Sequence, residues 1–207
     1  ATEEDGWMAL MFASQNGHEL CARALIEARA NVDATEEDGW TALMWATLSG
    51  HELCARALIE ARVNVDHASN IGRTALMQAS QNGHELCARA LIEARASVDH
   101  ASNDGETALI LASVCARALI EARANVDATE EDGWTALMFA SQNGHELCAR
   151  ALIEAGANVD AKEEKDWTPL MVAVQGGHEL CARALIGRML TPLRRMAGWH
   201  SCLLPKM

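Results

Sequence analysis

Apolar and polar positions along the chain predict pairs of short helices that recur at a fixed interval. In the segment 34–66, a tight turn precedes Thr41, a good N-cap for a helix that carries its apolar side chains on one face. Ser49-Gly50 ends this helix, and a second amphipathic helix follows over about 51–61. Two helices this short leave apolar faces that only neighbouring copies can cover, so the pattern indicates a stacked array.

The same block occurs six times, and this repetition is the dominant feature of the sequence. Blocks one and five differ only at Met8 against Thr135 and at Arg29 against Gly156. Successive blocks start 33 residues apart, except that the fourth is 28 residues long. The blocks begin at Ala1, Ala34, His67, His100, Ala128 and Ala161.

Composition agrees with a helical, globular chain. Of 207 residues, 50% are hydrophobic and 22% are charged, which is enough apolar material for a core, while aromatic residues reach only 4%. Sandwiches and barrels favour β-branched and aromatic residues, so we predict an all-α fold. With 17 Lys+Arg against 29 Asp+Glu the net charge is −12, which argues against nucleic acid as a partner.

No segment resembles a secretory signal or a membrane span. The longest apolar stretch, Ala108–Ala116, has nine residues, whereas a span needs about 20. We therefore expect a soluble chain without a membrane partner. Because the chain begins at Ala1 without an initiator methionine, we expect a fragment or a processed product.

Each complete block carries D-G-x-T-x-L or a close variant near its start, G-H in the middle and L-[LI]-E-A-x-A-x-V-[DN] at its end. With the 33-residue period, these positions resemble the ankyrin repeat over residues 1–186. The family signature T-P-L-H stands here as T-A-L-M in most blocks and as T-P-L-M at Thr168–Met171. The resemblance implies an all-α solenoid of helix-turn-helix repeats joined by hairpin loops, which acts as a non-catalytic scaffold for other proteins.

One position departs from the family pattern and predicts strained backbone. Ankyrin repeats usually have glycine just after the second helix, where φ is positive. This chain keeps glycine there in block five, at Gly156, and has arginine in the first four blocks. A non-glycine residue in this conformation costs roughly 1 kcal/mol. The arginines are Arg29, Arg62, Arg95 and Arg123.

The fourth block lacks five residues, including the Gly-His turn between its helices. Nothing from Ala108 to Ala124 would stop a helix, which leaves either one continuous helix or a pinched repeat with a very short loop. We expect the continuous helix, about 25 Å long at 1.5 Å per residue, and an irregular layer near 107–118. A deletion without a functional role explains the short block equally well.

Residues 187–207 no longer follow the repeat. They carry four basic and no acidic residues, whereas residues 1–186, with 13 basic against 29 acidic residues, carry −16. We expect a degenerate basic cap, a helix that docks on the sixth block through Leu193, Met196 and Trp199. A disordered end and a basic docking motif are the alternatives.

Cysteine recurs at one position of the second helix. Stacked helices lie about 8–10 Å apart, whereas a disulfide needs Cα atoms within roughly 4.4–6.8 Å. We therefore predict unpaired thiols that fill the core as small apolar side chains, which suits the cytoplasm or the nucleus. The row consists of Cys21, Cys54, Cys87, Cys115, Cys148 and Cys181, with Cys202 in the tail.

Candidate chemistry is sparse. The recurring His-Glu-Leu-Cys, as at His51–Cys54, offers two zinc ligands where a structural site needs four. No phosphate loop, nucleophile elbow or Ser/His/Asp arrangement occurs, and acidic trios such as Glu36-Glu37-Asp38 fall in hairpin tips where carboxylates are solvated. We predict no metal, no cofactor and no enzymatic activity.

The resemblance places partner binding on the hairpin tips and the exposed side of the first helices. It gives an acidic strip with spaced indoles, which suits partner segments that carry arginine or lysine. Packing of the indoles against neighbouring hairpins is the more ordinary alternative. The candidate residues are Glu4, Asp5, Trp7, Glu37, Asp38, Trp40, Arg73, Glu131, Asp132, Trp134 and Trp167. Asn70, Ile71, Asn103, Asp104, Glu106, Glu164 and Lys165 complete the strip, and Gln15, Asn16, Leu48, Ser49, Gln81, Asn82, Gln142 and Asn143 extend it at the helix ends.

Two other functions fit the same sequence. A chain of near-identical repeats could associate weakly end to end through uncapped apolar ends, as a structural module. It could also be a targeting module cut from a larger enzyme.

Overall fold

The computed structural model describes residues 3–200, with side chains for residues 9–190, and the chain forms twelve helices there. The all-α prediction is confirmed: apart from helices, the described residues contain only four isolated antiparallel bridges in the hairpin stems. The helices are α1 (Glu3–Gln15), α2 (Glu19–Glu27), α3 (Ala42–Leu48), α4 (Glu52–Glu60), α5 (Ala75–Gln81), α6 (Glu85–Glu93), α7 (Ala108–Leu111), α8 (Ala116–Glu121), α9 (Ala136–Gln142), α10 (Glu146–Glu154), α11 (Pro169–Gln175) and α12 (Glu179–His200).

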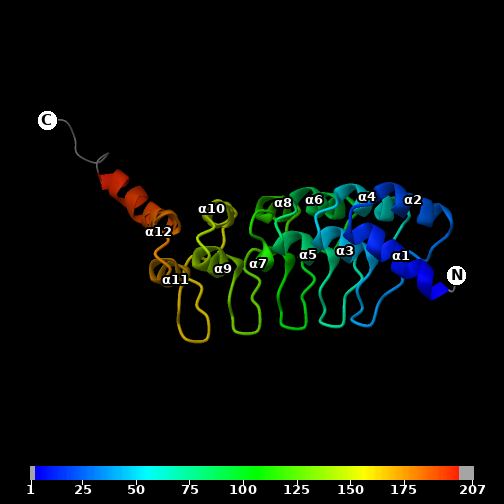
Figure 1. Ribbon diagram of the computed structural model, residues 1–207. Coiled ribbons are helices and arrows are strands. Elements are labelled where there is room, and N and C mark those ends of the chain that lie inside the picture. The colour runs from blue at the N-terminus through cyan, green and yellow to red at the C-terminus, as the bar shows by residue number, and fades with distance from the viewer. Residues whose placement is uncertain (1–2, 201–207) are drawn as a thin grey trace.

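The helices form two parallel rows, with the hairpin loops along one edge (Figure 1). The odd-numbered helices are the first helices of each repeat, and each contacts the next odd-numbered helix along the array. The even-numbered second helices form the other row, on the side away from the hairpin loops. Buried side chains from Leu10 to Leu185 belong to one hydrophobic cluster, so the core is continuous along the array.

Local signals at the helix ends act as the sequence predicts. Thr41 Oγ1 accepts a hydrogen bond from the Met44 amide at 3.3 Å, and the equivalent threonine caps every later first helix. After the second helices, Arg29, Arg62, Arg95 and Arg123 have φ between 61° and 65°. The predicted left-handed conformation at these arginines is confirmed.

The Gly-His turn couples neighbouring repeats. A side chain added at Gly50 would place its Cβ 2.5 Å from Nδ1 of His84, so only glycine leaves room for the histidine ring of the next repeat. The same ring bonds the Leu48 carbonyl oxygen through Nε2 at 3.0 Å. The recurring histidine therefore has a structural role at the junction between two layers.

The prediction of one continuous helix through the fourth block is wrong. Helix α7 ends at Leu111 and α8 begins at Ala116, with extended backbone at Ala112 (φ −69°, ψ 117°). Both halves belong to the core, because Leu109 is 2% exposed and Leu119 is 0% exposed. A straight helix through the fourth block would be too long for one layer of the stack, so it would not bury both leucines. Burial of both side chains therefore favours a break in the helix, although no glycine lies there. The fourth block is a pinched repeat with a very short loop.

The tail differs from the predicted separate cap. Residues 187–200 continue α12 as one helix, which leads away from the array beyond α11 (Figure 1). The side chains of Leu193, Met196 and Trp199, expected to dock on the sixth block, lie outside the described residues. None of the helices between Glu3 and His200 combines the length and the hydrophobicity that a membrane span requires.

Candidate protein-interaction surface

The hairpin tips are joined in series by backbone hydrogen bonds. The Asn70 amide donates to the Asp38 carbonyl oxygen at 3.0 Å, and the Asn103 amide donates to the Ile71 carbonyl oxygen at 3.1 Å. The Asn70 side chain also bonds the Glu37 carbonyl oxygen at 2.9 Å. Since each tip holds the next, the hairpins form a row that presents its side chains at regular intervals.

In the second and fifth blocks, the first glutamate of the acidic trio has a structural role. Glu36 accepts from the Trp40 amide, and Glu130 accepts from the Trp134 amide at 2.9 Å, which closes each hairpin on itself. Glu37 and its equivalents are exposed. The second and third acids of the trio therefore carry the charge that a partner can meet.

Three of the predicted tryptophans, Trp40, Trp134 and Trp167, are half-buried. The Trp40 ring lies 4.9 Å from the ring of Trp45 in α3, and the Trp134 ring lies 5.2 Å from that of Phe139 in α9. Each indole thus packs against an aromatic side chain of its own repeat. The rings of Trp40 and Trp134 pack against the first helices of their repeats, and all three tryptophans are only partly exposed to a partner.

The first block lacks the hairpin that its sequence predicts. Glu4, Asp5 and Trp7 lie within α1, which extends from Glu3 to Gln15 as one helix. Their expected placement on a hairpin tip is therefore wrong, and their side chains lie outside the described residues. The row of hairpins begins at the second block.

Several other candidates are used inside the array. Arg73 pairs with Glu106 of the next hairpin and donates to Gln81 at 2.8 Å. The side chains of Asn82 and Asn143 return to carbonyl oxygens of their own first helices, at 2.9 Å each. These residues stabilise the surface, and their polar groups are already engaged.

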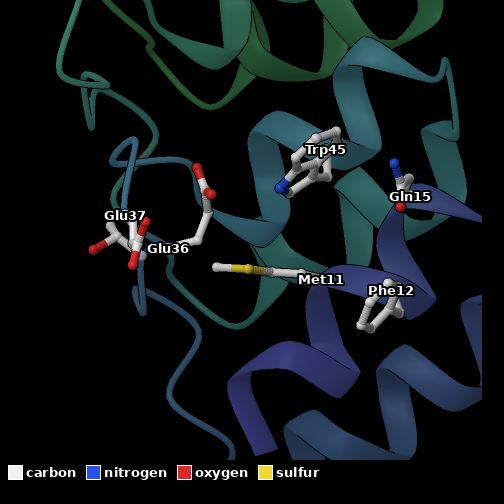
Figure 2. A pocket seen from close by; sticks show the side chains of 7 residues that line it. Met11, Phe12, Gln15, Glu36, Glu37 and Trp45 are labelled. Carbon is white, nitrogen blue, oxygen red and sulfur yellow. The ribbon is translucent and has the colours of Figure 1, made fainter. Parts of the chain in front are cut away.

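A depression opens between the first two repeats on the hairpin side. Its volume is about 720 Å³, and it lies between α1, α3 and the hairpin of the second block. Met11, Phe12 and Trp45 give it an apolar floor, and Phe12 remains 56% exposed. Figure 2 shows Glu36 and Glu37 on one side of the site, Phe12 and Trp45 on the other, and Met11 between them. The N-terminal depression, as we call this site, combines apolar area with adjacent carboxylates.

Phe12 and Trp45 are not among the residues that the repeat pattern predicts for this surface, although both stand at a distinctive position of the sequence. The position they share is the most variable one in the otherwise near-identical first helices. It holds Phe12, Trp45, Gln78, Leu111, Phe139 and Val172. Gln78 and Val172 are buried whereas Phe12 is 56% exposed, so the position is open to a partner only in some repeats.

The thiol row is buried as predicted. Cys54, Cys87, Cys115, Cys148 and Cys181 are at most 4% exposed, while Cys21 in the first repeat is exposed. All six are free thiols. Burial raises the pKa of Cys87 and of Cys115 to about 11 each, since the charged thiolate would lose its hydration. Within the described part of the chain, no three His, Cys, Asp or Glu side chains are grouped as a metal site would require.

Comparisons with known proteins agree with this architecture. The family model for ankyrin repeats, three copies per model, matches residues 1–69, 61–128 and 113–192. The chain therefore belongs to the ankyrin-repeat family.

Among solved structures, the Bd0816 predatory endopeptidase from Bdellovibrio bacteriovorus in complex with immunity protein Bd3460 contains a similar chain, the immunity protein. The two chains are 29% identical and superpose with a TM-score of 0.75, over 86% of this chain and 97% of the other. No curated protein sequence matches the chain.

Proposed function

We propose that this chain is a non-catalytic protein-interaction module that binds a basic, partly apolar segment of a partner along its hairpin side. The observation that carries the proposal is the N-terminal depression, where Phe12 and Trp45 leave apolar area open beside Glu37. Aromatic side chains beside carboxylates attract arginine through charge pairing and cation–π contact. The wider binding surface runs along the row of hairpins to Asp38, Trp40, Glu131, Asp132, Trp134 and Trp167.

Charge supports a basic partner segment. Among the described residues, no ion pair involves Glu37 or Asp38, so their carboxylates meet a partner without first losing an internal cation. The net charge of −12 also speeds the approach of a basic segment.

The similar immunity protein supports a folded partner. That protein occurs in a complex with an endopeptidase, and it covers most of this chain at 29% identity. Because this chain forms a similar repeat array, we infer that it also presents a surface to another protein. We further propose a reducing compartment, the cytoplasm or the nucleus, because buried thiols along the core are unpaired.

Titration of the chain into a dye-labelled short peptide of alternating arginine and leucine, followed by the fluorescence anisotropy of the dye, tests this proposal. We expect Trp45→Ala and the pair Glu37→Gln with Asp38→Asn each to weaken binding about tenfold, which corresponds to about 1.4 kcal/mol. The matched control neutralises the same trio positions in block five, Glu131→Gln with Asp132→Asn.

The control should weaken binding less than the change at Glu37 and Asp38, because the N-terminal depression lies beside block two. Binding should also weaken when the salt concentration rises from about 50 mM to about 500 mM. Absence of binding would contradict the proposal. So would an affinity that changes neither with Trp45→Ala nor with the salt concentration.

A second candidate function is end-to-end association. Helix α11 leaves Met171 and Val174 54% and 64% exposed, and they line a depression of about 630 Å³ with Trp167 and Leu170. An apolar end of this kind can stack on another copy. Sedimentation with a Met171→Glu variant separates this candidate from the first, since hairpin-side binding should survive the change.

A further inference from the structure

The last first helix of the array, α11, has an open apolar face that is buried in all five earlier repeats. Met171 is 54% exposed and Val174 is 64% exposed, and both line the depression of about 630 Å³ beside Trp167. At the position of Met171 the earlier repeats are at most 7% exposed, because the next first helix packs against this side. The end of the array therefore has room for one further first helix. The buried equivalents are Met11, Met44, Met77, Ile110 and Met138.

Gly177, beside this face, lacks the neighbour that its equivalents have. A Cβ added at Gly50 would lie 2.5 Å from Nδ1 of His84 in the next repeat. Gly144 also faces a histidine ring of the next repeat. Gly177 has the same positive φ (71°), yet within the described part of the chain nothing lies within 4 Å of a Cβ added there. The place of a histidine ring is therefore open next to the uncovered apolar face.

The sequence after block six carries the start signal of a first helix. Thr191-Pro192-Leu193 repeats the residues Thr168–Leu170 at the start of α11. There Thr168 Oγ1 accepts a hydrogen bond from the Met171 amide at 3.4 Å, and the proline lies in the first turn, where its missing amide costs no helical hydrogen bond. The repeated signal predicts a helix that begins at residue 192.

The end signal of a first helix follows at the expected distance. Gly198-Trp199-His200 resembles Gly176-Gly177-His178, which ends α11. His200 follows Thr191 by nine residues, and His178 follows Thr168 by ten. A helix from residue 192 that packs on α11 would therefore bring a histidine close to the open place at Gly177. No hairpin sequence precedes this helix, so the segment is a cap and not a complete repeat.

Helix α12 contains residues that disfavour it as one continuous helix. It has 22 residues, whereas the second helices of the other complete repeats have nine and end at the position of Gly187. Pro192 lies inside α12, where a proline cannot donate one helical hydrogen bond and its ring crowds the preceding turn. Such a proline disfavours a straight helix on the order of 100-fold. Gly187 also weakens the helix at this junction. A break between Gly187 and Pro192 is therefore favoured locally.

We propose that α12 breaks between Gly187 and Pro192 and that residues 192–200 fold back onto α11 as a C-terminal cap, in exchange with the extended helix of Figure 1. The four residues 187–190 span up to about 13 Å when extended, which exceeds the about 8–10 Å between packed helices. Residues 187–207 carry four basic and no acidic residues, whereas residues 1–186 carry −16, so charge attraction keeps the tail near the array.

Two apolar residues of the cap stand at positions that face the core in first helices. Counted from the capping threonine, Leu193 corresponds to Leu43 and Met196 corresponds to Ala46. Leu43 is 1% exposed and Ala46 is 0% exposed. The docked cap covers the face that end-to-end stacking would use, so the cap decides whether this end of the array can take another molecule. The cap does not depend on binding at the hairpin side.

Methionine oxidation by hydrogen peroxide in the full chain tests the proposal, with Met171 as the probe. Residues 166–183 form a tryptic peptide with a single methionine, so mass spectrometry follows the oxidation of Met171 directly. Met138, 0% exposed, is the internal reference for a buried methionine. In the variant Leu193→Asp with Met196→Asp the cap cannot dock. We expect Met171 to oxidise about tenfold faster there than in the wild-type chain, which corresponds to a cap that is docked about 90% of the time.

A second variant acts on the break itself. Pro192→Ala makes the continuous helix more favourable, so it should also speed the oxidation of Met171 while the helix content in circular dichroism is kept or rises. Leu203→Asp with Leu204→Asp is the matched control, because it places the same charges in the tail outside residues 192–200 and should leave Met171 protected. The milder Leu193→Gln with Met196→Gln serves if the aspartates prevent folding.

Protection of Met171 that is lost in the cap variant and with Pro192→Ala, but kept in the control, supports the proposal. Equal oxidation rates in the wild-type chain and the cap variant overturn it, and so does a control that exposes Met171 as much as the cap variant. Protection that increases with protein concentration also overturns it, since a second copy would then cover the face.

Discussion

The complete third repeat and the shortened fourth repeat build equivalent layers from helices of different length. Helices α5 and α6 have seven and nine residues, whereas α7 and α8 have four and six. The paired core positions are nevertheless equally buried, with Leu76 and Leu109 at 1% and 2% exposed, and Leu91 and Leu119 both at 0%. A layer of this array therefore needs the threonine cap of its first helix and its buried leucines. The last turn of the first helix and the first turn of the second helix can be absent.

The cost of the shortening falls on the junctions at the surface. The fourth repeat lacks the histidine ring that elsewhere covers the glycine of the preceding repeat, and Ser113 and Val114 lie beside Gly83 in its place. The ion pair from Arg89 to Glu121 of the fourth repeat spans 3.8 Å, whereas Arg56 to Glu93 spans 3.1 Å. The core of the fourth repeat is packed as in the third, whereas the contacts between α6 and α8 at the surface are looser.

The largest expected effect comes from the equivalent core leucines. We predict that Leu91→Ala and Leu119→Ala each lower the free energy of unfolding by about 3 kcal/mol, because both create a cavity in a fully buried site. Urea denaturation measures the two losses side by side. If Leu119→Ala costs far less, the fourth layer is more loosely packed than the third.

Restoring the missing turn should remove the difference between the two repeats. Insertion of Gln-Asn-Gly-His-Glu between Ser113 and Val114 should raise the free energy of unfolding by about 2 kcal/mol, since it lengthens both helices and returns the histidine ring to Gly83. A five-residue Gly/Ser insertion at the same place is the control, and it should not stabilise. Equal effects of the two insertions would contradict the structural role of the turn.

A smaller effect is expected at the left-handed arginines, which both repeats share. Arg95→Gly in the third repeat and Arg123→Gly in the fourth should each stabilise by about 1 kcal/mol, because φ is 63° and 65° there. Gly156→Arg in the fifth repeat, where φ is 94°, should destabilise by a similar amount. Thermal unfolding of the three variants shows whether each substitution raises or lowers the unfolding midpoint. An unchanged or lowered midpoint for the glycine variants would contradict the strain predicted at these arginines.

The last effect is absent at neutral pH and concerns the thiols at alkaline pH. The pKa of Cys87 and of Cys115 is about 11 in the folded chain, against 9.0 for an unperturbed thiol. The unfolded chain therefore releases these protons first, so the stability present below pH 9 is lost as the pH rises towards 11. We predict that Cys87→Ala and Cys115→Ala flatten this decline equally. A flattening in the third repeat alone would show that Cys115 is less buried than Cys87.

The sequence predicts the parts of this fold that depend on local signals. Thr41 and its equivalents start the first helices, and Arg62 takes positive φ after a second helix, because caps and helix ends are set by nearby residues. The break at Ala112 was missed because no residue there stops a helix, and burial of Leu109 and Leu119 against neighbouring layers decides it.

The candidate site was predicted only in outline. Placement of the hairpin carboxylates follows from the repeat, but the engagement of Arg73 by Glu106 depends on contacts between repeats that local sequence does not show. The apolar side chains of Phe12 and Trp45 stand at the variable position of the first helices, which the hairpin motifs do not include.

Native-state hydrogen exchange across the third and fourth repeats tests most directly whether the array is one continuous unit. We predict that the hydrogen-bonded backbone amides of Leu111 and Leu119 are protected as strongly as those of Gln78 and Leu91, their counterparts in the third repeat, because the two layers share one core. Much faster exchange confined to α7 and α8 would contradict it and would divide the array into two separately opening pieces.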